Sequence, residues 1–155
     1  MLRKLLMISA IATAAALVFG GVSFAGASGT TDRTLTAIAT HVHFTTADVG
    51  ATGDSPGDEL VFTAKETDLD GNAVGRLDGY CVFTRTPSGH EVFEECLLAH
   101  VLTDGQITLQ GSFDQSSSDN QEFAVTGGTG AYEEAQGQAI LRFTHRFRFD
   151  IELES

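Results

Sequence analysis

The sequence predicts an all-β domain of eight antiparallel strands. After the first 27 residues no stretch shows the 3.6-residue period of an amphipathic helix, whereas short alternating runs rich in Val, Ile, Thr and Phe recur throughout. Clusters of Gly, Asp and Ser separate these runs, as turns do between strands. The predicted strands span residues 34–46, 59–67, 73–86, 91–102, 106–112, 121–126, 136–144 and 146–154.

The breaks between these runs carry the residues that tight turns require. Asp70-Gly71-Asn72 and Asp104-Gly105 suit short hairpins. The run Thr126-Gly-Gly-Thr-Gly130 predicts a sharp reversal, because glycine adopts positive φ without steric cost. Thr144-His145-Arg146 holds fewer turn residues than the other breaks, so one bent strand running through it is the alternative to two strands.

Two strands differ in which of their faces are apolar. In the last strand Phe147, Phe149, Ile151 and Leu153 share one face, and charged residues occupy the other, which is typical of a strand with one wet face. In the fourth strand both faces are apolar: Val92, Leu98 and Leu102 lie on one, and Phe93, Leu97 and Val101 on the other. A closed barrel whose outer face meets another subunit would cover both faces. A two-sheet sandwich is the alternative.

The chain divides into a signal peptide, residues 1–27, and a single domain, residues 28–155. Arg3 and Lys4 precede the apolar run Leu5–Val18, and small residues near position 25 suit cleavage by a signal peptidase. The apolar run is short for a membrane span, and no second one follows. A secreted protein without a membrane anchor is therefore predicted.

Charge narrows the range of partners. The chain holds nine Lys and Arg against 21 Asp and Glu, a formal charge of −12. Removing the signal peptide takes away Arg3 and Lys4 and leaves seven against 21, a charge of −14. A surface of this sign repels phosphate backbones and anionic lipids, so neither nucleic acid nor a membrane is expected as a partner.

The two cysteines, Cys81 and Cys96, are predicted to form a disulfide. An even cysteine count in an exported chain favours pairing. A hairpin centred between Ser88 and Gly89 would place the two residues directly opposite one another. Closing this loop would stabilise the fold by about 3 kcal/mol in the chain-entropy view. A catalytic thiol is the competing interpretation.

No cofactor and no metal are expected. The Gly128-Thr-Gly130 run lacks the third glycine and the βαβ unit of a dinucleotide-binding domain. His41-Val-His43 has the spacing of two metal ligands on one strand face, but nothing in the sequence places a third ligand beside them. A pair of solvated or partly buried histidines is the simpler interpretation.

Several segments, taken in order, resemble the allene oxide cyclase/dirigent barrel superfamily, and most closely its secreted bacterial members. They are Gly57-Asp-Glu-Leu-Val-Phe-Thr63, Val74-Gly-Arg-Leu-Asp-Gly-Tyr-Cys-Val82, Gly105–Gly111 and Phe123-Ala-Val-Thr-Gly-Gly-Thr-Gly-Ala-Tyr132. The resemblance covers roughly residues 57–143. It implies an eight-stranded antiparallel barrel around an apolar cavity, often assembled as a homotrimer.

The catalytic residues of these relatives are not matched. Cys81 resembles a cavity cysteine of the cyclases, but their first-strand glutamate and asparagine have no counterpart between Leu35 and Thr46. Their second-strand asparagine falls at Ala64, and the dirigent arginine after the glycine-rich turn falls at Gln136. The resemblance therefore implies architecture more than activity. Whether the protein is an enzyme is left open, and no catalytic residue is assigned.

The leading functional prediction is a secreted barrel that binds a small hydrophobic molecule in its lumen. A cyclase, isomerase or dirigent-like stereochemical guide is one alternative, and a filled barrel that binds another protein is a second. Arg85 and Glu94 are expected to be diagonal neighbours able to pair. The predicted ligand-binding residues are Phe62, Phe83, Arg85, Glu94, Leu98, His100, Phe123, Phe147 and Phe149.

Overall fold

A computed structural model describes residues 33–86 and 92–154 of the 155-residue chain. The predicted signal peptide and the centre of the hairpin predicted between Ser88 and Gly89 lie outside these residues. Within the described segments, no helix has the length and apolar character that crossing a membrane requires.

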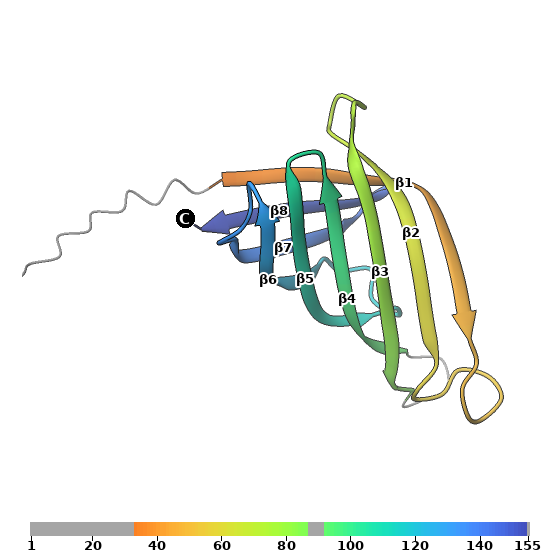
Figure 1. The fold of residues 1–155 in the computed structure, drawn as a ribbon. Helices are drawn as coiled ribbons and strands as arrows, with labels where there is room; N and C mark the ends of the chain where they lie inside the picture. Colours follow the sequence, from red (N-terminus) through yellow and green to blue (C-terminus); the bar gives the residue numbers. More distant parts are fainter. Residues whose placement is uncertain (1–32, 87–91, 155) are drawn as a thin grey trace, which may run out of the picture.

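Eight strands form one closed antiparallel barrel in which each strand pairs with its neighbours in the chain and β8 pairs with β1 (Figure 1). The barrel, rather than the sandwich, is therefore correct. The strands are β1 (Arg33–Ala47), β2 (Glu59–Thr67), β3 (Ala73–Arg85), β4 (Phe93–Leu102), β5 (Gly105–Asp114), β6 (Gln121–Gly130), β7 (Gln136–Phe143) and β8 (Phe147–Glu154).

The glycine-rich run is the end of a strand rather than the turn itself. β6 continues through it to Gly130 and stays paired with β5 up to Gly105. A Cβ on Gly128 would lie 2.2 Å from the Tyr132 carbonyl oxygen, and Gly130 has a φ of +63°. Only glycine accommodates both the close approach and the left-handed backbone. The turn after Gly130 places the buried Tyr132 at the end of the barrel where β6 connects to β7.

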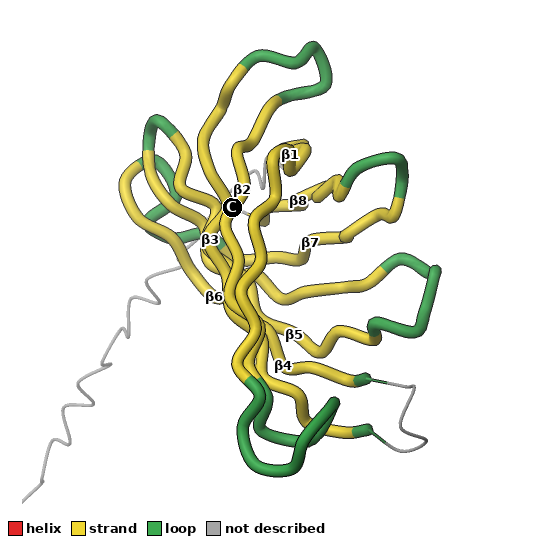
Figure 2. Tube along the Cα trace, turned by 90° about the vertical axis from the view of Figure 1, so that its right-hand side faces the viewer, coloured by secondary structure: helices red, strands yellow, loops and turns green. Residues whose placement is uncertain are grey.

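The two ends of the barrel differ, and each is defined by its connections. The cavity end carries the connections 48–58, 115–120 and 144–146, together with the described ends of β3 and β4 at Arg85 and Phe93. The packed end carries the connections 68–72, 103–104 and 131–135, together with Arg33 and Glu154. Figure 2 shows the β5–β6 and β7–β8 turns on the same side of the molecule. The break at Thr144–Arg146 is therefore a true turn between two strands.

β1 changes its pairing partner along its length, from β8 to β2. Its first part, from Arg33 to Ala39, pairs with β8, and beyond Ala39 only β2 lies beside it. A register shift between Thr40 and His43 marks a bulge, at which His41 adopts a φ of 53°. The expectation that His41 and His43 share a face of a regular strand is therefore wrong, because the bulge interrupts the alternation.

Candidate functional site

The interior of the barrel at the cavity end is hollow. The cavity has a volume of about 350 Å³ and is lined by side chains of all eight strands. Its lining is almost wholly apolar, and a carboxyl group and one amide are the polar side chains in it. The lining residues are Ala39, Val42, Phe44, Leu60, Phe62, Leu77, Cys81, Glu94, Cys96, Leu98, Phe113, Gln115, Phe123, Leu141, Phe143, Phe147 and Phe149.

Six of the nine predicted ligand-binding residues line this cavity: Phe62, Glu94, Leu98, Phe123, Phe147 and Phe149. The other three lie elsewhere. Phe83 is buried beside Glu94 in the β3–β4 register without lining the cavity. His100 lies deeper, towards the packed end. Arg85 is exposed.

The expected pairing of Arg85 with Glu94 is absent, and a bulge explains why. The β3–β4 register runs regularly from Cys81↔Cys96 to Phe83↔Glu94, then shifts so that Arg85 lies opposite Phe93 rather than Val92. The shift turns the Arg85 side chain outwards, where its guanidinium carbon lies 5.0 Å from the centre of the Phe93 ring. Regular alternation could not have revealed this.

The disulfide between Cys81 and Cys96 is confirmed, with an S–S distance of 2.03 Å. Both residues line the cavity beside Glu94, and Cys96 Sγ lies 3.7 Å from Glu94 Oε2. In the described part of the chain these three side chains are also the one group whose potential metal-ligating atoms lie close together. The sulfurs are bonded to each other, so the group offers a metal no thiolate.

Among the described residues, Glu94 is the one carboxyl group in the cavity wall. Its side chain is fully buried, and its Oε1 accepts a hydrogen bond from the Gln115 amide. Burial raises the pKa of Glu94, and the hydrogen bond from Gln115 opposes part of that rise. Burial therefore makes this carboxyl group easier to protonate than an exposed one, and in its protonated form it can donate a hydrogen bond to a carbonyl oxygen.

A buried pair lies between the cavity and the packed end. His100 Nδ1 of β4 is 2.6 Å from Glu66 Oε1 of β2, and neither side chain is exposed. Glu66 Oε2 and His100 Nε2 have no hydrogen-bond partner in the structure. The His100 ring meets Phe149 edge to face at a centroid distance of 4.9 Å, so one side-chain layer separates the pair from the cavity.

Sequence reasoning missed both the pairing partner of His100 and part of the aromatic lining. Glu66 and His100 both alternate inwards, and their meeting follows only once β2, β3 and β4 are in register. Phe143 continues the inward alternation of Leu141 along β7, a signal that the sequence did hold. The aromatic residues missed are Phe44, Phe113 and Phe143.

The fold and the cavity define the class: a closed antiparallel barrel with an apolar cavity in its lumen. Residues 38–148 match the family described as "Allene oxide cyclase barrel like domain". The chain belongs to this family, as the resemblance implied. A search of curated proteins finds no match.

Three solved structures illustrate the similarity. A pyocyanin demethylase is 27% identical, with a TM-score of 0.67 over 78% of this chain and 99% of its own. A heme-binding cyclase of neoabyssomicin biosynthesis is 18% identical, with a TM-score of 0.66 over 83% of this chain and 70% of its own. A pterocarpan synthase dirigent protein is 17% identical, with a TM-score of 0.64 over 81% and 90%. The last two identities establish a shared fold only.

Proposed function

We propose that this protein binds a small hydrophobic molecule in the lumen of its barrel. The observation that carries the proposal is the cavity of about 350 Å³, which lies within the range of about 300–1,000 Å³ common for small-molecule sites. Burying an apolar ligand against its phenylalanine rings is favourable by the hydrophobic effect. Glu94 supplies one polar contact that would fix the ligand's orientation.

Flat aromatic molecules are the first ligand class to test. The wall holds seven phenylalanines, and rings of this kind stack against or meet the edges of other aromatic rings. Pyocyanin, the compound in the name of the 27% identical structure, is itself a flat aromatic heterocycle. In its protonated form, Glu94 can donate a hydrogen bond to a carbonyl oxygen or a ring nitrogen of a ligand.

The second candidate is a cyclase, an isomerase or a dirigent-like guide that acts on an apolar substrate in the same cavity. The cyclase and dirigent proteins of the same barrel fold support it. A shaped cavity can hold a reactive chain in one conformation and lower the entropic part of a barrier without an acid–base pair. Recovering the bound compound unchanged after prolonged incubation would favour binding alone, whereas conversion would favour this candidate.

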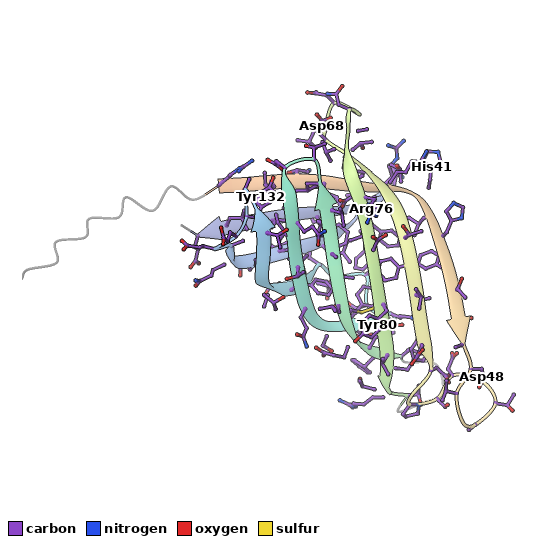
Figure 3. The ribbon with its side chains drawn as sticks, viewed as in Figure 1. His41, Asp48, Asp68, Arg76, Tyr80 and Tyr132 are labelled. Atoms are coloured by element: carbon purple, nitrogen blue, oxygen red, sulfur yellow. A yellow bond between two sulfur atoms is a disulfide. The ribbon has the colours of Figure 1, made fainter. Side chains whose placement is uncertain are left out.

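We also propose that the outer face of the barrel mediates self-association, for which the resemblance implies a homotrimer. Val61, Tyr80 and Leu97 lie opposite one another on β2, β3 and β4, and all three are exposed. Figure 3 shows Tyr80 projecting from β3. A row of exposed apolar side chains is more common at an interface than on a free surface.

Export is a further part of the proposal. The disulfide and the basic-apolar-small pattern of residues 1–27 support a secreted protein. Production of the full chain in a secreting bacterial host and intact-mass measurement of the medium test it. A mature chain that begins near residue 26 or 28 is expected, and retention of the full-length chain in the cells would contradict export.

Binding is tested by fluorescence titration of the mature protein with 2-methoxynaphthalene, a neutral flat aromatic probe. Ala39→Leu adds a side chain to the cavity wall and should weaken binding at least about 10-fold by filling the space. Ala124→Leu, on the exposed face of β6, is the matched control and should leave affinity unchanged. Failure of the wild type to bind aromatic probes, or equal loss in both variants, would refute the proposal.

Native mass spectrometry of the protein purified without reducing agent gives an independent measurement. A retained small molecule would identify the ligand class, and the same spectrum reports the number of subunits. Phe149→Asp, which places a carboxylate in the cavity wall, should release the ligand or unfold the protein. Unchanged stability and unchanged binding in this variant would contradict the assignment of the cavity.

A further inference from the structure

A lateral window opens where β1 leaves β8. The last β1–β8 pair is Ala39↔Phe147, and beyond it β1 is bordered by β2 alone. The bulge at His41, with its left-handed φ of 53°, lies immediately past this point. Figure 3 shows His41 at the bend of β1, projecting away from the barrel. The β7–β8 turn, residues 144–146, borders the gap from the other side.

A second pocket fills this window and shares a wall with the central cavity. Its volume is about 480 Å³. Ala39, Val42 and Phe147 line both spaces. The two spaces therefore adjoin, and only these three side chains are common to both walls.

The window pocket carries a positive charge in a chain whose net charge is negative. Arg146 lines it together with His41 and His145, and none of its described lining residues carries a carboxylate. The whole chain holds nine Lys and Arg against 21 Asp and Glu, so a lining with an arginine and no carboxylate departs from the average. A positive charge at the mouth of a cleft concentrates negatively charged ligands there.

Arg146 forms no ion pair with a described carboxylate, unlike Arg142 and Arg148 on the same hairpin. Arg142 and Arg148 both pair with Asp150, at 2.7 and 2.8 Å. Within residues 33–86 and 92–154, no carboxylate lies within 4.0 Å of the Arg146 guanidinium. A guanidinium without a partner at the rim of an apolar cavity can bind an oxyanion with two parallel hydrogen bonds.

We propose that the window is the head-group site of the ligand: the cavity takes an amphipathic anion, with an apolar ring body in the lumen and a carboxylate or similar oxyanion at Arg146. This inference rests on the proposed lumen binding and specifies the ligand class. His41 and His145 flank the head group and add hydrogen-bond donors. Glu94 lines the lumen and not the window pocket, so its carboxyl group does not lie at the head-group position.

The test compares 2-naphthoate with its neutral methyl ester, both titrated against the full mature protein by fluorescence. Arg146→Gln should weaken 2-naphthoate binding about 3-fold and Arg146→Glu about 10-fold, as expected for one exposed charge contact and for its reversal. Binding of the ester should change less than 2-fold. The preference of the wild type for the anion should shrink in about 0.5 M sodium chloride.

Arg76 provides the matched control, because it is an exposed arginine on β3 that lines neither pocket and pairs with Asp78 at 2.8 Å. Arg76→Gln and Arg76→Glu change the net charge by the same amounts and should leave both affinities unchanged. Equal effects of the Arg76 and Arg146 variants, or equal loss of the acid and the ester, would overturn the window site alone. If the wild type binds neither compound, lumen binding fails and the window site fails with it.

Discussion

The two ends of the barrel are built from the same eight strands with the same inward alternation, yet one is filled and the other is hollow. At the packed end Ile107, Leu109 and Ile151 have at most 1% of their surface exposed. At the cavity end the rings of Phe113 and Phe143 lie 6.0 Å apart and surround space rather than fill it. Branched aliphatic side chains interdigitate, whereas rigid aromatic rings attached to a barrel wall leave a gap at its axis.

The buried carboxyl groups also differ between the two ends of the barrel in the partners they have. Towards the packed end, Glu66 has an ionisable partner, His100. In the cavity wall, Glu94 has only the neutral Gln115 amide. A carboxyl group sealed inside a fold needs a partner to remain buried, while one in a ligand site can leave its hydrogen-bonding capacity for the ligand.

The largest expected effect comes from breaking the buried pair. His100→Leu leaves the Glu66 carboxyl group buried without its partner and should lower the free energy of unfolding by about 3–5 kcal/mol. Removing both groups with Glu66→Leu/His100→Leu should cost much less than the two single changes added together. Urea denaturation of the three variants measures this coupling. Additive single costs would mean that the two residues act independently.

Truncating an aliphatic side chain should lower the free energy of unfolding by different amounts at the two ends of the barrel. Leu109→Ala creates a void at a fully buried position and should cost about 3 kcal/mol. Leu60→Ala enlarges a cavity that already exists, and should cost about 1 kcal/mol, because the residue is only partly buried. Guanidinium denaturation of both variants gives the comparison. Equal losses would indicate that the cavity end is packed as firmly as the other.

The barrel could be predicted from the sequence because strand alternation and turn residues are local signals, and the pairing of residues follows from the strand register. Alternation and turn residues located all eight strands, and the symmetric spacing about one turn paired Cys81 with Cys96. The alternation also accounts for the six predicted ligand-binding residues that line the cavity. These properties depend on period and register, which a strand pattern fixes.

Most of the errors concern features that the pattern of a single strand does not specify. Bulges turned Arg85 outwards and separated His41 from His43, and a register shift of this kind has no reliable signature in residue type. The contact between Glu66 and His100 spans β3, so it depends on three strands at once. The window depends on how far β8 extends beside β1, which a single strand pattern does not specify.

A pH series tests the effect of burying Glu94 in the cavity wall. Because the folded pKa of Glu94 is raised above its ordinary value of 4.5, the folded state holds more protons than the unfolded state between the two values. Stability due to this group should therefore fall as the pH rises through that window and stay low above it. Urea denaturation from about pH 4 to pH 8 should show Glu94→Gln gaining stability relative to the wild type.

The control for the pH series is Glu122→Gln, a change of the same kind on the exposed face of β6. It corrects for the general effect of removing one negative charge from an acidic chain. A relative gain in Glu122→Gln as large as that in Glu94→Gln would show that burial of Glu94 is not the cause.

The smallest effect on stability is expected on the outside of the barrel, where the consequence should be a change in assembly. Val61, Tyr80 and Leu97 are 51%, 47% and 41% exposed, so Tyr80→Asp should alter the free energy of unfolding of one subunit by less than about 0.5 kcal/mol. If this row forms an interface between copies, the added carboxylates face one another and should shift the protein to monomer. Sedimentation velocity measures the shift, with Thr126→Asp on β6 as an exposed control. An unchanged sedimentation coefficient in Tyr80→Asp would exclude this face from assembly and leave the two ends of the lumen as the functional contrast in the molecule.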